Sequence, residues 1–302
     1  MSTNSATIEQ TNTRLMSRVA DYVELTKPRI AVMMLISVGV AAVVAKWQQP
    51  DLWMLFHVIM GVGFVAASAS AANQVLERES DGRMERTLRR PLPAGRLSSR
   101  QAIRFAAITL LAGIAYLSVT APWPVAAWSL ATWVLYVVLY TPLKRYSVWN
   151  TFVGAISGAL PICIGWAAAE GTYDLRLAGL FTTMFLWQFP HFMAIAWLFR
   201  KQYERAGLQM MTVVDGSGQR AGVQAVLTAV GLLPVSLIPA LHGPAPAAGL
   251  YAALALVLGI GQLVTAVLFF ANRTDQTARL LLRASLIYLP LLLGLLLLIP
   301  LV

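Results

Sequence analysis

Apolar residues form nine long blocks along the chain, separated by shorter polar stretches. A helix of about 20 apolar residues is long enough to cross a lipid bilayer, and nearly every block reaches that length. The pattern predicts an all-α fold, a polytopic membrane protein with nine transmembrane helices. The predicted helices cover residues 29–47, 52–76, 101–120, 123–140, 150–169, 175–199, 221–241, 246–271 and 280–301.

The polar segments complete the expected organisation. Two connections are long, at residues 77–100 and 200–220. Residues 1–20 are polar and lack an apolar core, so they do not resemble a cleavable signal peptide and are expected to form a mobile cytoplasmic tail. Residues 21–302 are then expected to form a single transmembrane domain.

The basic residues are segregated along the chain. The N-terminal tail and the loops after helices two, four, six and eight hold 21 of the 23 Lys and Arg residues, and the other side holds only Lys46 and Arg176. Because cytoplasmic loops are enriched in Lys and Arg, the N-terminus is expected inside and the C-terminus outside. The net charge of +10 is therefore ascribed to membrane orientation and not to nucleic-acid binding.

Two further features of the composition exclude other classes of protein. Only 12% of the residues are charged, whereas soluble domains carry about 25%. The lone cysteine, Cys163, excludes an intrachain disulfide and a cysteine-based metal cluster.

A polar helix face follows the second apolar block. Asn73, Glu77 and Asp81 are spaced four residues apart, so their side chains lie along one face of a helix. Three oxygen ligands on one face suit Mg²⁺, which commonly bridges carboxylates to substrate phosphates. The alternative is an ordinary solvated acidic helix end. Asn73 and the small residues 67–72 argue against it, because they leave an open, polar helix face just inside the membrane, where polar side chains are costly and mark functional sites.

Basic residues follow this face and return after the fourth block. Arg86 and Arg90 lie in the first group, and arginine suits phosphate oxygens. Lys144 and Arg145 form the second group with Tyr140, on the same membrane side as Asp81. Together they indicate a diphosphate site, with Lys144 neutralising the leaving group. Positive-inside charge and interfacial anchoring are the alternatives for these residues.

A second polar pair lies within the sixth block. Gln188 and His191 are three residues apart and share a helix face, and Pro190 between them is expected to kink the helix. His191 could ligate heme iron, act as a base, or hydrogen-bond a neighbouring helix. His57 and His242 are expected to be structural or solvated.

These segments resemble the UbiA-type intramembrane prenyltransferase superfamily and, within it, the branch that farnesylates heme. Asn73-x-x-x-Glu77-x-x-x-Asp81 is similar to the superfamily's NxxxDxxxD diphosphate motif, with Glu at the middle position. The resemblance covers residues 25–214, and the last three helices match in hydropathy alone. The marks of the heme branch are Leu25-Thr26-Lys27-Pro28-Arg29, Tyr140-Thr141 with Leu143-Lys144-Arg145, Gly158-Ala159-x-Pro161, Gly165-Trp166, Trp187-Gln188-x-Pro190-His191-Phe192 and Tyr203-x-x-Ala206-Gly207-x-x-Met210.

The resemblance implies transfer of a farnesyl group from farnesyl diphosphate to the 2-vinyl group of heme B, with water addition, giving heme O. It implies Mg²⁺ on Asn73, Glu77 and Asp81, with Arg90 and Lys144 assisting catalysis. Trp187, Phe189, Phe192 and Tyr203 are candidates for lining the cavity. The expected substrate-binding residues are Lys27, Arg29, Arg86, Tyr140, Arg145, Gln188, His191, Lys201 and Tyr203.

One position departs from the family's pattern. Gln202 stands where the heme branch usually keeps an Asp just before Tyr203. Glu204 or Asp215 could supply the missing carboxylate, or Lys201 could bind diphosphate directly. The departure bears on a second Mg²⁺ and leaves room for a weakened enzyme.

Three rival functions remain open at this point. The acceptor could be another molecule, such as an aromatic quinone precursor, or the chain could be a catalytically weak heme-binding assembly factor. A transporter is disfavoured, because the polar groups cluster at one membrane face and no repeat is visible. The acidic residues of the tail argue against a transit peptide and favour a bacterial plasma membrane, with the active site at the cytoplasmic face. Candidate partners are a heme A synthase and terminal oxidase assembly proteins.

Overall fold

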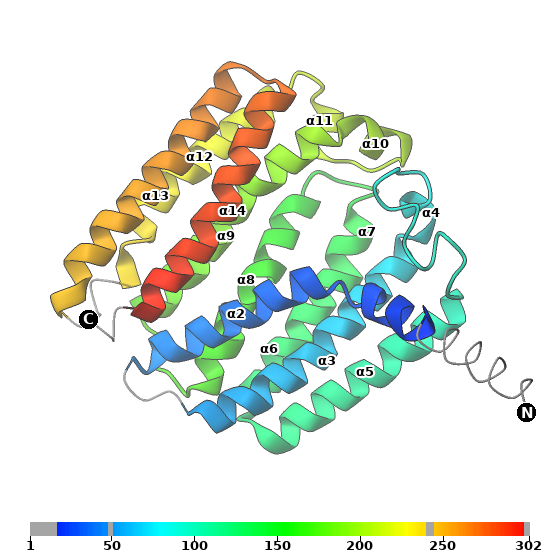
Figure 1. The fold of residues 1–302 in the computed structure, drawn as a ribbon, viewed down its shortest axis with the longest axis horizontal. Coiled ribbons are helices and arrows are strands. Elements are labelled where there is room, and N and C mark those ends of the chain that lie inside the picture. Colours follow the sequence, from blue (N-terminus) through cyan, green and yellow to red (C-terminus); the bar gives the residue numbers. More distant parts are fainter. Residues whose placement is uncertain (1–16, 48–50, 240–244, 299–302) are drawn as a thin grey trace, which may run out of the picture.

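The computed structural model describes residues 17–47, 51–239 and 245–298, and within these ranges every element is helical, with no strand (Figure 1). His242 and the turn around residue 243 lie outside the described residues. The helices are α2 (Pro28–Ala45), α3 (Leu52–Leu76), α4 (Arg78–Asp81), α5 (Ser99–Thr120), α6 (Trp123–Val134), the π-helix η1 (Leu135–Tyr140), α7 (Thr141–Leu143), α8 (Asn150–Ala168), α9 (Leu175–Leu198), α10 (Arg200–Arg205), α11 (Met211–Val214), α12 (Gln219–Val235), α13 (Ala245–Ala271) and α14 (Asp275–Leu298).

The all-helical prediction is confirmed for the described residues, and each of the nine predicted ranges overlaps a long helical run there. In the described part of the chain, seven helices are long and apolar enough to cross a membrane. The two remaining runs, α9 and α12, fall outside that set. α12 has only 17 residues, and α9 carries polar residues such as Gln188 and His191, which lower its hydropathy.

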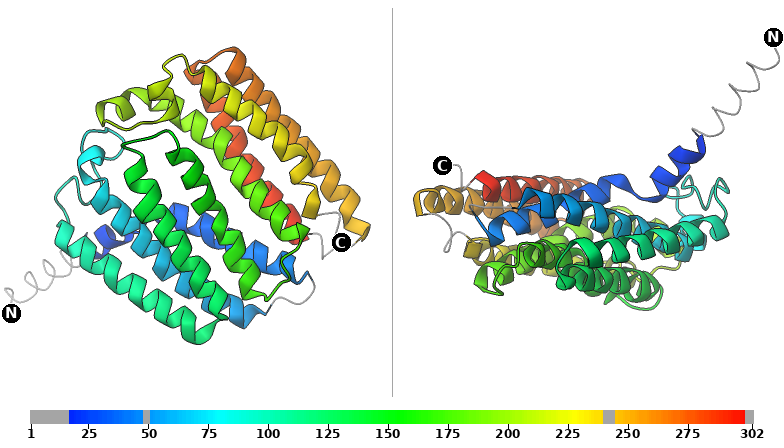
Figure 2. Two further views of the ribbon diagram at one scale, coloured as in Figure 1. Left: turned by 180° about the vertical axis from the view of Figure 1, so that it is seen from behind. Right: turned by 90° about the horizontal axis from the view of Figure 1, so that it is seen from below.

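The long helices pack as a layered bundle. Figure 2 (right) shows α2 and α14 above the green helices that include α8. α2 packs on α8, while α9 packs on α8, α12 and α14. A cluster of buried apolar side chains, including Trp166 and Tyr288, fills the space where α2, α8, α9 and α14 meet. Apolar side chains from α2, α8, α9 and α14 thus hold these four helices together.

Glycines allow the closest helix contacts. A Cβ atom on Gly165 of α8 would lie 2.0 Å from the carbonyl oxygen of Val38 in α2. A Cβ atom on Gly158 would lie 2.2 Å from Oε1 of Gln188 in α9. Small residues let helix backbones approach one another inside a membrane. These two glycines of the sequence motifs therefore have a packing role.

We expect Gly165→Ala to destabilise the protein by about 1–3 kcal/mol, because the added methyl group must push α2 away from α8. Gly39→Ala in α2 is the matched control, since no atom lies within 4 Å of the added Cβ there. Thermal unfolding in detergent measures the difference. Equal melting temperatures for the two variants would contradict the close contact of α2 and α8.

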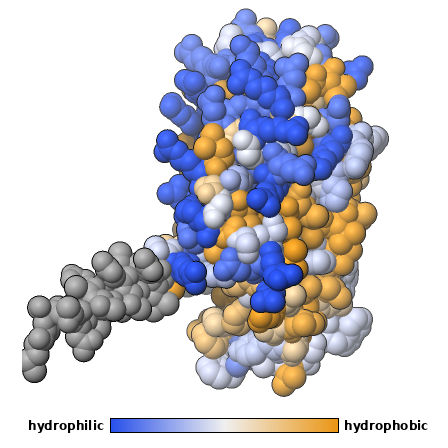
Figure 3. All heavy atoms as spheres, turned by 90° about the vertical axis from the view of Figure 1, so that its right-hand side faces the viewer, coloured by the Kyte–Doolittle hydropathy of each residue, from blue (hydrophilic) through white to orange (hydrophobic). Residues whose placement is uncertain are grey.

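The polar connections gather at one end of the bundle. α4, α10 and α11 lie together at the upper right of Figure 1. Seen from that side, hydrophilic residues crowd one part of the surface and hydrophobic residues cover the lower part and the right edge (Figure 3). The candidate diphosphate residues belong to this polar end, because α4 and the segment after α7 are part of it.

The segment before α2 is tied to this end. Residues 17–25 are helical, and the Gln74 side chain donates to the Leu25 carbonyl oxygen at 2.8 Å. Arg96 donates to the carboxylate of Asp21 and, at 2.6 Å, to that of Glu24. Residues 1–16 of the predicted mobile tail lie outside the described residues. The tail at 1–20 and the single domain at 21–302 stay predictions.

Candidate active site

Asn73, Glu77 and Asp81 share one helix face. α3 ends at Leu76, but the helical hydrogen bonds continue: the Glu77 amide donates to the Asn73 carbonyl oxygen (2.9 Å) and the Asp81 amide to the Glu77 carbonyl oxygen (2.7 Å). The exposed fractions of the three residues are 0%, 8% and 1%. The spacing read from the sequence therefore produces three buried side chains in a row, not a solvated acidic helix end.

Each of these side chains is paired with a cation from another segment. The cations come from the residue before α2, from the loop after α4 and from the end of α7. The three pairs join Lys27 Nζ to Asn73 Oδ1 (2.6 Å), Lys144 Nζ to Glu77 Oε1 (2.7 Å) and an Arg90 guanidinium nitrogen to Asp81 Oδ2 (2.6 Å). We call these six residues the cation–oxygen cluster. It brings together the predicted catalytic residues, and adds Lys27.

Burial and opposite charges act against each other in the cluster. Burial raises the pKa of Asp81, and Arg90 offsets this only in part. Burial also disfavours the charged form of Glu77, but Lys144 and Lys27 outweigh it and hold the pKa below its ordinary value. Burial and then Arg90 lower the pKa of Lys27 to about 8. Lys144 is buried too, yet Glu77 holds its pKa well above the ordinary value.

Lys27 reaches the cluster through an unusual backbone conformation. Its φ of 51° lies in the left-handed region, directly before Pro28. A side chain other than glycine is rarely held there, and the residue before a proline is further restricted. The conformation turns the chain from residues 17–25 into α2 while the Lys27 ammonium points at Asn73. Strained backbone of this kind is typical of functional positions.

Thr141 fixes the orientation of Asn73. The Asn73 Nδ2 amide donates to Thr141 Oγ1 (2.9 Å), and that hydroxyl donates to the Tyr136 carbonyl oxygen (2.7 Å). The Asn73 carbonyl oxygen is thereby left to face Lys27. Thr141 directly follows η1, and short π-helical turns are frequent at functional sites. Apart from the Tyr140-Thr141 motif, no pattern in the sequence predicts this contact, because a π-helical turn shifts the helix face that a residue occupies.

We expect Thr141→Val to lower prenyl transfer about tenfold, because the Asn73 amide loses the partner that orients it. Thr109→Val in α5 is the matched control, since that buried hydroxyl bonds only to carbonyl groups of its own helix. Steady-state assays of both variants measure the effect. An equal loss in the two variants would indicate a general destabilisation and contradict the orienting role.

The other residues predicted around the cluster divide into two groups. Tyr140 belongs to the site, because the Lys144 ammonium lies 4.3 Å from the centre of its ring. Arg145 instead donates to the Leu76 carbonyl oxygen (3.1 Å) and so closes the C-terminal end of α3. Arg29 and Lys201 are exposed.

Arg86 joins the loop after α4 to α10. Its guanidinium lies 4.5 Å from the centre of the Phe199 ring and donates to the Tyr203 hydroxyl at 3.0 Å. Its backbone amide donates to Gln202 Oε1 at 3.3 Å. Gln202, which stands where the family resemblance implies an Asp, therefore contacts the loop after α4 through its neutral amide oxygen.

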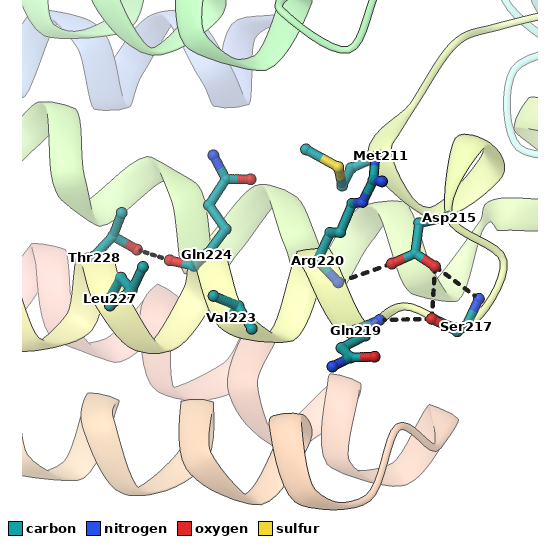
Figure 4. A pocket seen from close by; sticks show the side chains of 9 residues that line it. All are labelled: Met211, Asp215, Ser217, Gln219, Arg220, Val223, Gln224, Leu227 and Thr228. Carbon is teal, nitrogen blue, oxygen red and sulfur yellow. Dashed lines mark hydrogen bonds between the residues drawn. The ribbon is translucent and has the colours of Figure 1, made fainter.

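Asp215, one candidate for the missing carboxylate, is engaged in local hydrogen bonds. It accepts hydrogen bonds from the backbone amides of Ser217 and Arg220 and from the Ser217 hydroxyl, and so caps the start of α12 (Figure 4). These groups line a pocket of about 630 Å³ along α11 and α12 that contains none of the predicted site residues. Glu204 is exposed.

Gln188 and His191 face different helices, although their spacing suggested a shared face. Gln188 Nε2 donates to the Ala155 carbonyl oxygen of α8 (2.9 Å). The Nδ1 atom of His191 lies 2.9 Å from the Ser285 hydroxyl oxygen of α14. α9 runs through Pro190 without a break. Phe189, predicted to line a cavity, is 3% exposed and packs edge-on against Phe185.

The donor types decide which metal the site could hold. In the described ranges, no three His, Cys, Asp or Glu side chains converge on a possible metal position. The candidate metal ligands are therefore the mixed set of one amide and two carboxylates on the α3–α4 face. All three are hard oxygen donors of the kind that Mg²⁺ takes, so the residue types fit that ion. A metal ion there would have to displace the cationic side chains of Lys27, Lys144 and Arg90 from these oxygens.

Comparison with known proteins gives the family. The UbiA prenyltransferase family matches residues 32–296. A protoheme IX farnesyltransferase of Solibacter usitatus is 42% identical over 287 residues, which is 92% of this chain and 98% of that protein. The enzyme of the same name from Rhodopirellula baltica is also 42% identical, over 89% of this chain and 96% of its own length.

Solved structures agree on the fold. A UbiA homologue from Archaeoglobus fulgidus bound to DMAPP and Mg²⁺ superposes with a TM-score of 0.71 over 91% of this chain and 97% of its own, at 15% identity. A digeranylgeranylglyceryl phosphate synthase superposes with a TM-score of 0.77 over 94% of this chain and 99% of its own, at 17% identity. The chain therefore belongs to the UbiA prenyltransferase family and, within it, to the protoheme IX farnesyltransferases.

Proposed function

We propose that this protein transfers the farnesyl group of farnesyl diphosphate to the 2-vinyl group of heme B and so makes heme O. The name shared by its relatives supports this reaction. The observation that carries the proposal is the cation–oxygen cluster, in which three buried oxygen side chains meet three cations at the polar end of the bundle. Such a cluster contains oxygen side chains that can bind a metal ion and cationic side chains that can bind a diphosphate.

We propose that Asn73, Glu77 and Asp81 hold Mg²⁺. When bound, the ion neutralises charge on the oxygens of the departing diphosphate. The A. fulgidus homologue of the same fold was solved with Mg²⁺ and a prenyl diphosphate, and the donor types in this chain suit the ion. One face of three oxygens supports a single ion held by the protein, since Gln202 supplies no carboxylate and Asp215 caps α12.

In this proposal the cationic side chains of the cluster also bind the substrate. Lys27, Lys144 and Arg90 leave the side-chain oxygens that they now contact and bind the diphosphate oxygens of the substrate. Preorganised cations aimed at developing negative charge are a large source of rate acceleration. As the C1–O bond of farnesyl diphosphate breaks, its electron pair leaves with the diphosphate, and an allylic cation remains.

The acceptor completes the reaction. The π electrons of the heme 2-vinyl group form a C–C bond to the allylic cation, which leaves a cation next to the porphyrin ring. Water then forms a C–O bond to that carbon and loses a proton, giving the hydroxyethylfarnesyl chain. Aromatic residues such as Trp187 and Tyr203 would exclude water from the first cation. His191 is the proposed heme contact.

We also propose that nine helices span the membrane, with the N-terminus in the cytoplasm and the C-terminus outside. The segregation of Lys and Arg supports this orientation and a cytoplasmic active site. α9 and α12 then cross the bilayer as part of the packed bundle, where polar side chains such as Gln188 find partners. A bacterial plasma membrane, and contact with a heme A synthase or with terminal oxidase assembly proteins, complete the proposal.

Purified protein in liposomes tests the reaction. Farnesyl diphosphate, Mg²⁺ and H₂¹⁸O are supplied with heme B or, in parallel, with an aromatic acid such as 4-hydroxybenzoate. We expect mass spectrometry to detect heme O carrying one ¹⁸O atom and no prenylated aromatic acid. Transfer to the aromatic acid alone would instead establish the rival acceptor. Heme binding without product would favour an assembly factor.

A further inference from the structure

Ser285 of α14 holds two aromatic side chains of α9. Its backbone carbonyl oxygen accepts from Trp187 Nε1 at 2.7 Å, and its hydroxyl oxygen lies 2.9 Å from His191 Nδ1. The Trp187 and His191 rings stack, with centroids 5.1 Å apart and an interplanar angle of 22°. Ser285 itself is fully buried. Ser285 thus contacts both stacked rings, the imidazole at Nδ1 and the indole at Nε1.

The hydroxyl proton of Ser285 is already used. It points to the Leu282 carbonyl oxygen, 2.7 Å away on the same helix. A serine hydroxyl has one proton and two acceptor lone pairs, so toward His191 it acts as the acceptor. The His191 Nδ1 atom must then carry the proton and donate it. In a neutral imidazole this leaves Nε2 with a free lone pair.

The Nε2 atom of His191 makes no hydrogen bond to any described residue, and the residue as a whole is partly exposed. His57 provides a contrast. Its Nδ1 atom lies 2.6 Å from the Tyr116 hydroxyl oxygen, but no further hydrogen bond of that hydroxyl to a described residue shows which of the two atoms is the donor.

We infer that Ser285 is a positioning residue that holds His191 in the Nδ1–H tautomer, so that Nε2 serves as the axial ligand of the iron of substrate heme B. The inference rests on the proposed function. Histidine ligands of metals almost always donate their other ring N–H to a fixed acceptor, which sets the tautomer and strengthens the ligand. Here that acceptor is the Ser285 hydroxyl, and Trp187 holds the ring plane.

Pulsed EPR of ferric heme B bound to protein with ¹⁵N-labelled histidine tests the ligand directly. We expect a coupling from a directly bound imidazole ¹⁵N in the wild type and in His57→Ala, and its loss in His191→Ala. Added imidazole should restore a nitrogen ligand to His191→Ala, which would show that this variant is folded. The wild-type measurement needs no substitution and so does not depend on the folding of any variant.

A heme titration tests Ser285. We expect Ser285→Ala to weaken ferric heme binding about tenfold, and Ser285→Thr, which keeps the hydroxyl, to restore it. Ser129→Ala is the matched control, because that buried hydroxyl bonds only within its own helix, to the Val125 carbonyl oxygen. Unchanged heme affinity in Ser285→Ala would overturn the positioning role.

The outcomes separate this inference from the proposed function. Heme O formation with no histidine ¹⁵N coupling, or with a coupling that persists in His191→Ala, would overturn the inference and leave the function intact. Transfer of farnesyl to a different acceptor, with no binding of ferric heme, would overturn both.

Discussion

Replacing Asp81 by alanine is expected to lower kcat for heme O formation about 1,000-fold. Asp81 is 1% exposed, and its carboxylate lies 2.6 Å from the Arg90 guanidinium. The change removes one of the three proposed metal ligands and leaves Arg90 without its anionic partner. Both effects act on the charge that develops on the departing diphosphate, so the loss appears in kcat as well as in the KM for farnesyl diphosphate. Mass-spectrometric initial rates measure it.

Glu79→Ala is the matched control for this change. Glu79 lies in the same short helix, α4, but its side chain is exposed. We expect its rate to stay within a factor of two of the wild-type rate, since surface substitutions change little. Similar losses in the two variants would assign the effect to α4 as a whole and contradict a specific role of the Asp81 carboxylate.

Lys144→Met is expected to affect both stability and rate. Lys144 and Glu77 form a largely buried ion pair at 2.7 Å. Removing one partner leaves an uncompensated buried charge, which destabilises a protein by about 3–5 kcal/mol. Loss of the ammonium that neutralises the leaving group is expected to lower kcat about 100-fold as well. Thermal unfolding and initial rates measure the two effects separately.

A second substitution separates the two effects of Lys144→Met. Adding Glu77→Gln removes the unpaired charge, so the double variant should regain most of the lost stability while its rate stays low. Lys46→Met is the control for loss of a lysine, since Lys46 is exposed at the opposite end of α2 from Lys27. A double variant that regains full activity would show that Lys144 acts only by stabilising Glu77.

The periodicity of the sequence accounts for most of the fold. Long apolar blocks require helices, and each predicted block overlaps a helical run in the described part of the chain. The i, i+4, i+8 spacing of Asn73, Glu77 and Asp81 likewise placed three oxygens on one face, since that relation depends only on the helix repeat. Proximity of Lys144 and Arg90 to these residues was also expected, because all of them belong to one membrane side.

The periodicity of the sequence could not predict the contacts between helices. Gln188 and His191 were assigned one face, yet they contact α8 and α14, because the spacing within a helix does not define which neighbours surround it. The contacts of Thr141 with Asn73 and of Ser285 with His191 were missed for the same reason. Each contact joins residues at least 68 positions apart in the chain, and a lone hydroxyl residue in an apolar helix carries no signal of its partner.

Binding of Mn²⁺ in place of Mg²⁺ tests the cation–oxygen cluster most directly. Wild-type protein is mixed with Mn²⁺ and an unreactive thiolo analogue of farnesyl diphosphate, and pulsed EPR records the coupling of the metal to ³¹P. We predict a single bound Mn²⁺ with a ³¹P coupling that is lost in Asp81→Ala and retained in Glu79→Ala. The same ³¹P-coupled ion in Asp81→Ala would contradict the account, because the diphosphate and its metal would then bind somewhere other than the α3–α4 face.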